Sequence, residues 1–205
     1  MYHKNVPKVV DHAVRRKQII EGLLRVAVRE GLHAVTMRAV AAETEVSLRL
    51  VQHYFQSKAR LMHATLEYLE CESRDRWAAR LAELPDPVPA RVLVEALLAE
   101  ALPTDERSRT FHLMWTSYAV LAMTDRELAE QPFVEGPKRL ERQLGDVLAR
   151  AQATGELPAD LDAPTEAARL LAVSHGLGTG VLVGQRTPAE AIAVLGYHLD
   201  RTFHD

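Results

Sequence analysis

The stretch from Thr36 to Lys58, TMRAVAAETEVSLRLVQHYFQSK, constrains this chain of 205 residues most strongly. Two short segments with helical apolar periodicity are separated there by only a few residues. Thr36 and Ser47 are suited to cap these segments, because their hydroxyl oxygens can accept from backbone N–H groups of the first turn. Ser57 can cap a third, longer segment in the same way. The stretch therefore predicts two short helices joined by a tight turn, followed directly by a long helix.

Helical signals continue along the rest of the chain. Ala, Leu, Arg and Glu dominate, and apolar residues recur at three- and four-residue spacing. After a loose arm at residues 1–10, Asp11 is expected to cap a first helix that Gly31 ends. Thr124 and Thr187 each begin a Thr-x-x-Glu capping box. We therefore predict an all-α fold of about nine helices, with a joint at the prolines that begin with Pro85.

Charge is distributed unevenly along the chain. Residues 1–60 carry 11 Lys and Arg against 5 Asp and Glu, whereas the whole chain has a net charge of -3. A small basic segment on a larger acidic body favours a polyanionic partner for the N-terminal part only. Chance clustering of surface charge is the alternative at this point.

Two helices joined by a tight turn can form a helix-turn-helix, in which the second helix enters the DNA major groove. The residues expected on the core side are Val40, Ala41, Val46, Val51 and Phe55. Arg49 can read guanine and Gln52 can read adenine, while Lys58 lies at a helix N-terminus that favours phosphate. The candidate DNA contacts are Thr36, Arg38, Ser47, Arg49, Gln52, His53, Tyr54 and Lys58.

With this ordered pattern, residues 12–62 resemble the DNA-binding domain of the TetR/AcrR family of bacterial transcription regulators. The residues that carry the resemblance are Ala27, Gly31, Thr36, Met37, Val40, Ala41, Val46, Ser47, Tyr54, Phe55, Lys58 and Leu61. The resemblance implies that Leu48–Tyr54 is the recognition helix and that Tyr54 and Lys58 bind phosphate. It also implies a homodimer on a palindromic operator in double-stranded DNA.

Two positions depart from the family pattern. The family usually has glycine in the turn, where this chain has Glu45, so this glutamate must adopt the turn geometry and point its charge away from phosphate. The family often has tyrosine at the position of Gln52. A phosphate contact is therefore lost there or replaced by a base contact.

The resemblance continues into the C-terminal part, where residues 165–203 look like the last two helices of the family. Small residues recur there at intervals of four: Ala168, Ala172, Gly176, Gly180 and Gly184. Such a stripe lets another helix approach closely, and we interpret it as part of a dimer interface. An intramolecular packing stripe is the alternative.

The resemblance also implies a pocket for a small-molecule effector in the C-terminal domain, with no cofactor. The candidate lining residues are Phe111, His112, Met114, Trp115, Tyr118, Met123 and His175, and ordinary core packing is the alternative for each. The predicted domains are residues 1–57 for DNA binding and residues 58–205 for effector binding and dimerisation.

The residue spacing does not support an enzyme or a metal-binding protein. The nine histidines show neither His-x3-His nor HExxH spacing, and Cys71 has no cysteine partner. The lone cysteine and the lack of a long apolar run favour a cytoplasmic protein without a membrane span. We therefore expect a ligand-responsive transcriptional regulator, most often a repressor. The alternative is a helical DNA-binding or protein-interaction module without a small-molecule ligand.

Overall fold

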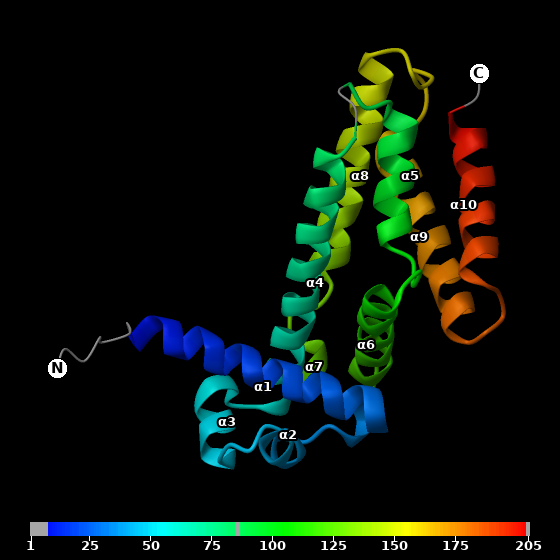
Figure 1. The fold of residues 1–205 in the computed structure, drawn as a ribbon. Coiled ribbons are helices and arrows are strands. Elements are labelled where there is room, and N and C mark those ends of the chain that lie inside the picture. Colours follow the sequence, from blue (N-terminus) through cyan, green and yellow to red (C-terminus); the bar gives the residue numbers. More distant parts are fainter. Residues whose placement is uncertain (1–7, 85–86, 204–205) are drawn as a thin grey trace. The chain divides into compact units, whose positions relative to one another are not determined.

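The computed structural model describes residues 8–84 and 87–203, with side chains from His12 onward. Residues 1–7 of the expected arm and Pro85 lie outside this range. The described residues form ten α-helices and one 3-10 helix, without strands (Figure 1). The predicted all-α fold is confirmed.

The helices follow one another as α1 (Lys8–Glu30), η1 (Leu32–Ala34), α2 (Met37–Glu43), α3 (Leu48–Phe55), α4 (Lys58–Ala82), α5 (Ala90–Glu100), α6 (Glu106–Ala122), α7 (Arg126–Ala129), α8 (Glu135–Ala153), α9 (Ala163–Leu182) and α10 (Pro188–Thr202). The chain divides into two compact units. Unit 1 contains residues up to Tyr68 and Ser117–Phe133, and unit 2 contains Leu69–Thr116 and the chain from Val134 onward. Helices α4 and α6 therefore contribute to both units, and the predicted functional boundary between residues 57 and 58 stays a prediction.

All three caps expected in the Thr36–Lys58 stretch form. The hydrogen bonds run from Ala39 N to Thr36 Oγ1 (3.0 Å), from Leu50 N to Ser47 Oγ (3.2 Å) and from Arg60 N to Ser57 Oγ (3.3 Å). Each satisfies a backbone N–H group that the first helical turn leaves unpaired. The starts of α2, α3 and α4 are thus set by local sequence.

Helix α1 approaches the end of α2 closely at Gly22. A Cβ atom at this position would overlap the methyl group of Thr44. Thr44 is buried, its hydroxyl donates to the Val40 carbonyl oxygen (2.7 Å), and its own carbonyl oxygen accepts from Gln18 Nε2 (3.1 Å). Glycine at position 22 leaves room for the Thr44 methyl group at this close approach, where the Gln18 hydrogen bond joins α1 to the end of α2.

Four of the five residues expected on the core side of the helix-turn-helix are buried: Val40, Ala41, Val51 and Phe55. Val46 was expected to be buried with them but is only half-buried. It lies in the turn between α2 and α3, where the backbone runs over the surface. Its N–H group donates to the Ala41 carbonyl oxygen (3.0 Å), which holds the turn against α2.

Two expected helix starts were wrong. Helix α1 begins at Lys8, three residues before Asp11, so Asp11 is not its cap. Asp125, not Thr124, caps α7, and its carboxylate accepts from the N–H groups of Glu127 and Leu128. Thr124 donates its hydroxyl back to the Leu121 carbonyl oxygen (3.3 Å), which removes it from the capping position.

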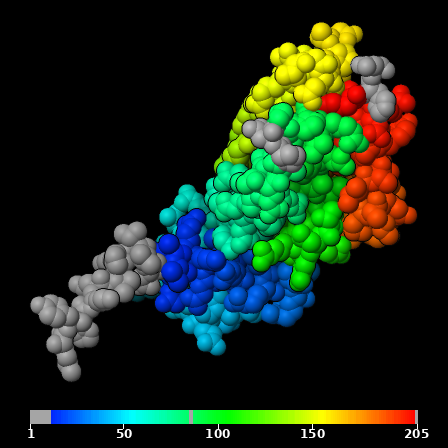
Figure 2. Space-filling view, turned by 45° about the horizontal axis from the view of Figure 1, so that its top comes forward, coloured from blue at the N-terminus to red at the C-terminus, as the bar shows by residue number. Residues whose placement is uncertain are grey.

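The second predicted capping box is confirmed. Thr187 Oγ1 accepts from Glu190 N (3.2 Å), and Thr187 N donates to the Glu190 carboxylate (2.7 Å). This box starts α10, whose surface adjoins that of α9 in Figure 2 (red and orange). The core of unit 2 is built from apolar residues of α5, α8, α9 and α10, including Val94, Leu98, Leu144, Leu148, Leu170 and Leu195.

The left-handed residue in the turn before α3 is expected to strain the backbone, and substitutions there can measure this strain. Glu45 has φ of 54°, a left-handed conformation that costs a residue with a Cβ about 1–2 kcal/mol. Glu45→Gly removes this cost but adds about 0.5–1 kcal/mol of backbone entropy. We expect Glu45→Gly to unfold in urea with a free energy about 0.5–1 kcal/mol higher than that of Glu45→Ala, which loses the charge and keeps the Cβ. Equal stability of the two variants would contradict strain at this position.

Candidate DNA-reading surface and effector cavity

Helix α3 has one buried and one exposed face. Val51 and Phe55 are buried, whereas Arg49, Gln52 and His53 are exposed. An exposed arginine and glutamine on a short helix are free to reach base edges in the major groove. This is the arrangement that a recognition helix requires.

All eight predicted DNA contacts lie in unit 1, and each has an exposed or half-exposed side chain. Thr36 and Arg38 lie at the start of α2, and Lys58 lies at the start of α4. The Tyr54 hydroxyl is held by a hydrogen bond to His12 Nδ1 (2.8 Å). This bond fixes the half-buried Tyr54 ring at the surface, and sequence spacing gave no sign of the part played by His12.

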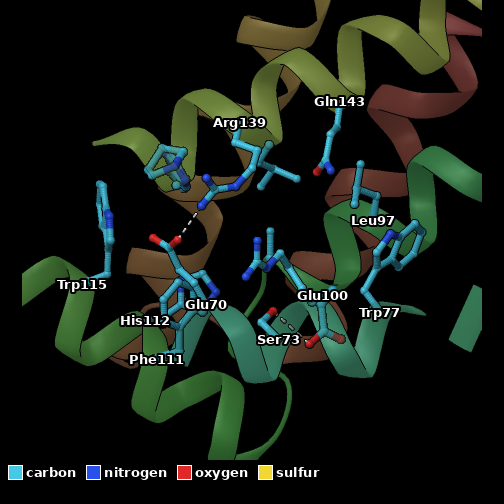
Figure 3. A pocket seen from close by; sticks show the side chains of 16 residues that line it. Glu70, Ser73, Trp77, Leu97, Glu100, Phe111, His112, Trp115, Arg139 and Gln143 are labelled. Carbon is cyan, nitrogen blue, oxygen red and sulfur yellow. Dashed lines mark hydrogen bonds and ion pairs between the residues drawn. The ribbon is translucent and has the colours of Figure 1, made fainter. Parts of the chain in front are cut away.

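Unit 2 contains a partly open cavity, in which the centres of water molecules can occupy about 120 Å³. A single water needs roughly 10–15 Å³ by this measure, so the space can hold a small organic molecule. Its lining comes from α4, α5, α6, α8 and α9 (Figure 3). The lining residues are Glu70, Ser73, Arg74, Trp77, Leu97, Glu100, Ala101, Phe111, His112, Trp115, Gly136, Pro137, Arg139, Leu140, Gln143 and His175.

Four of the seven candidate pocket residues line this cavity: Phe111, His112, Trp115 and His175. Met114 is buried but does not line it. Tyr118 and Met123 belong to unit 1, where the Tyr118 hydroxyl donates to the Leu128 carbonyl oxygen (3.1 Å) and Met123 is 79% exposed. The three- and four-residue spacing did not separate these residues because α6 runs through both units.

Sequence reasoning missed the α4 and α8 sides of the cavity. Trp77, a large apolar side chain in a charged segment, was the one local signal for α4. On α8, Arg139 and Gln143 extend toward residues of α4 in Figure 3. Nothing in their spacing relates them to residues about seventy positions earlier.

Both carboxylates in the lining are engaged by arginines. Glu100 is buried, and its oxygens bind Arg76 Nε (3.0 Å) and Arg80 (2.7 Å). Glu70 binds Arg139 (2.9 Å), which links α4 to α8. Because a carboxylate inside a protein needs a cationic partner, these ion pairs stabilise the charged lining.

Two aromatic residues of the lining carry unpaired polar atoms. His112 Nε2 and Trp115 Nε1 are buried, and neither has a hydrogen-bond partner in the described part of the chain. Burial lowers the pKa of His112 to about 4, and His175 adds to this effect. His112 is therefore a neutral imidazole at pH 7. The His175 ring stacks on the Trp115 ring with centroids 5.3 Å apart.

The small-residue stripe is only partly continuous. Ala172 and Gly176 are exposed on α9, and Ala168 is half-exposed. Gly180 is buried, and Gly184 lies beyond the end of α9 with φ of 74°. The exposed stripe on the helix therefore ends before Gly180.

Two family models match the chain. Residues 19–65 match bacterial regulatory proteins of the tetR family, and residues 90–204 match the C-terminal part of BetI-type transcriptional repressors. The chain belongs to the TetR family of transcriptional regulators. The family consists of ligand-responsive DNA-binding regulators and not of enzymes, which confirms the function class expected from the sequence.

Individual relatives agree with this membership. The regulator BetI of Burkholderia ambifaria is 31% identical over 150 residues, which cover 71% of this chain and 74% of the relative. A TetR-family regulator from Rhodococcus superposes with a TM-score of 0.81 at 22% identity, over 93% of this chain and 99% of the other. A regulator from Saccharomonospora viridis, solved in complex with choline, has a TM-score of 0.76 and 25% identity, over 92% and 95% of the two chains.

Two further properties of the described residues bear on function. No group of three or more His, Cys, Asp or Glu side chains is placed to hold a metal ion. None of the described helices combines the length and the apolar character that a membrane crossing demands.

The neutral state of His112 predicts a pH dependence for this TetR-family protein. The folded state disfavours a proton on His112 that the unfolded chain takes up below about pH 6.5, so stability from this group is present above pH 6.5 and lost as the pH falls toward 4. With a pKa of about 4 for His112 in the folded state, the free energy of unfolding is lowered by about 3 kcal/mol at pH 4. We expect a smaller loss of unfolding free energy between pH 7 and pH 4 in His112→Gln. The exposed His33→Gln variant is the control, and equal losses in both variants would contradict the buried neutral imidazole.

Proposed function

We propose that this protein binds a palindromic operator in double-stranded DNA as a homodimer, represses transcription and is released when an effector occupies the cavity of unit 2. The observation that carries the proposal is the exposed face of α3 with Arg49, Gln52 and His53, in a chain of the TetR family. Two α3 helices related by a two-fold axis would read half-sites about one DNA turn apart, roughly 34–36 Å. We place the protein in the cytoplasm with its DNA.

We assign separate roles to the proposed DNA contacts. Arg49 reads guanine and Gln52 reads adenine, because their side chains can form bidentate hydrogen bonds with these bases. Lys58, Tyr54 and Ser47 bind phosphate and set the register of α3. Thr36, Arg38 and His53 complete the surface, and their exposure supports this assignment.

We place the dimer interface on α9 and α10. Large apolar side chains are exposed on α10 and directly after α9: Tyr197 and Ile192 of α10 are 58% and 39% accessible, and Val183, the residue after α9, is 72% accessible. Ala172 and Gly176 are exposed on α9 and would let a partner helix approach closely. Exposed apolar area of this kind is typical of protein interfaces.

We propose that the effector acts through α4 and α6, because both helices line the cavity and both continue into unit 1. The effector shifts the protein toward the released state only by its difference in affinity for the two states. The choline complex of the Saccharomonospora relative supports a small-molecule ligand in a regulator of this fold.

The operator proposal is tested by sequencing the DNA fragments that the purified protein retains. We expect a palindrome, with Arg49→Ala and Gln52→Ala each relaxing the preference at one base pair per half-site by about 1–3 kcal/mol. Lys58→Ala should weaken binding to all sequences and reduce the salt slope by about one, whereas Lys138→Ala in unit 2 should change neither. Retained fragments without a shared sequence would contradict operator recognition.

The dimer proposal is tested at Gly176. Apart from its chain neighbours and the adjacent backbone of α9, no described atom lies within 4 Å of a Cβ placed on this residue, so Gly176→Leu fits the folded protomer. We expect it to block close helix approach and shift sedimentation toward the monomer. Ala149→Leu on the exposed side of α8 adds similar bulk outside the interface and should leave the dimer intact. A dimeric Gly176→Leu protein would exclude this face.

A further inference from the structure

We infer that the cavity of unit 2 takes a small organic acid, with an apolar or aromatic skeleton and a carboxylate head group. This inference rests on the proposed function, since it treats the cavity as the effector site. It assigns to this chain a ligand of opposite charge to the choline bound by the Saccharomonospora relative.

The negative charges of the lining are already neutralised. Glu100 binds two arginines, Arg76 and Arg80, and Glu70 binds Arg139. A cationic ligand would have to displace one of these guanidinium groups to reach a carboxylate. Because partly buried ion pairs are costly to break, the lining offers a cation no ready partner.

The positive charge that remains belongs to Arg74. This residue lines the cavity with an exposed side chain, and its guanidinium makes no hydrogen bond or ion pair to another described residue. A guanidinium offers five N–H donors and no acceptor, in a geometry that matches a carboxylate. Arg74 is thus the group most suited to bind the head group of an acid.

Two unpaired nitrogen atoms of α6 also favour a ligand that carries acceptor oxygens. Trp115 Nε1 is buried without a partner and can only donate a hydrogen bond. His112 is 92% buried, and its Nε2 atom also lacks a partner; a neutral imidazole can donate through this nitrogen. A buried donor without a partner is unfavourable, so each group would be stabilised by an acceptor oxygen of a ligand.

The remaining walls suit the skeleton of such an acid. Trp77, Phe111, Leu97 and Leu140 supply apolar surface to the cavity. Aromatic faces can also attract a cation, which is the strongest argument for an amine. Arg74, an unpaired cation in the same lining, opposes a bound cation and favours an anion, so we infer an acid and not an amine.

The chain provides its own probe for this inference. Its two tryptophans, Trp77 and Trp115, both line the cavity, so the intrinsic fluorescence of the full-length protein reports binding there. We would titrate three probes that share one skeleton: 4-phenylbutanoate, 4-phenylbutan-1-ol and 4-phenylbutylammonium. We expect the carboxylate to bind at least tenfold more tightly than either of the other two.

Variants separate the head-group contact from general packing. Arg74→Ala should abolish the carboxylate preference, and Trp115→Phe, which keeps the ring and loses the N–H donor, should weaken carboxylate binding several-fold. Arg107→Ala removes an exposed arginine of α6 outside the cavity and should keep the preference. Trp77 still reports binding in Trp115→Phe.

Three results would overturn the acid assignment: ammonium binding as tightly as carboxylate, no carboxylate binding up to millimolar concentration, or an unchanged preference in Arg74→Ala. DNA retention by the same preparation is measured separately. A protein that retains DNA and fails these probe tests keeps the proposed regulatory function and loses only the ligand class. A protein that retains no DNA loses the regulatory function whatever the probes show.

Discussion

The position of α3 depends on the close approach of α1 to the end of α2. Gly22 leaves room for Thr44, whose carbonyl oxygen accepts a hydrogen bond from Gln18 of α1. The next residue, Glu45, takes a left-handed conformation and sends the chain into α3. The α3 side chains that we propose to contact DNA follow directly after this corner, and we expect a larger residue at position 22 to displace them together.

Local chemistry made the helix-turn-helix predictable. Thr36, Ser47 and Ser57 cap their helices as expected, because a cap needs only a hydroxyl and the backbone of the next turn. The same reasoning failed at Thr124, where Asp125 lies one residue closer to the helix and accepts two backbone N–H groups. Two capping residues in succession compete, and sequence spacing alone does not decide between them.

The cavity was less predictable because its polar contacts join distant parts of the chain. The ion pair between Glu70 and Arg139 links α4 to α8, and Glu100 on α5 is held by arginines of α4. No periodicity relates such residues, so the sequence indicated only the α6 side and His175. The unpaired state of Arg74 becomes visible only once the other arginines are seen to be occupied.

The continuity of α4 and α6 restricts how this regulator can be recombined with its relatives. A chimera that exchanges one unit must be joined inside a helix, because no loop separates Tyr68 from Leu69 or Thr116 from Ser117. An α-helix turns about 100° per residue, so inserting or deleting one residue at a junction would rotate the transplanted part by that angle. Exchange of whole units therefore requires both helices to be joined in register, together with a third junction near Phe133.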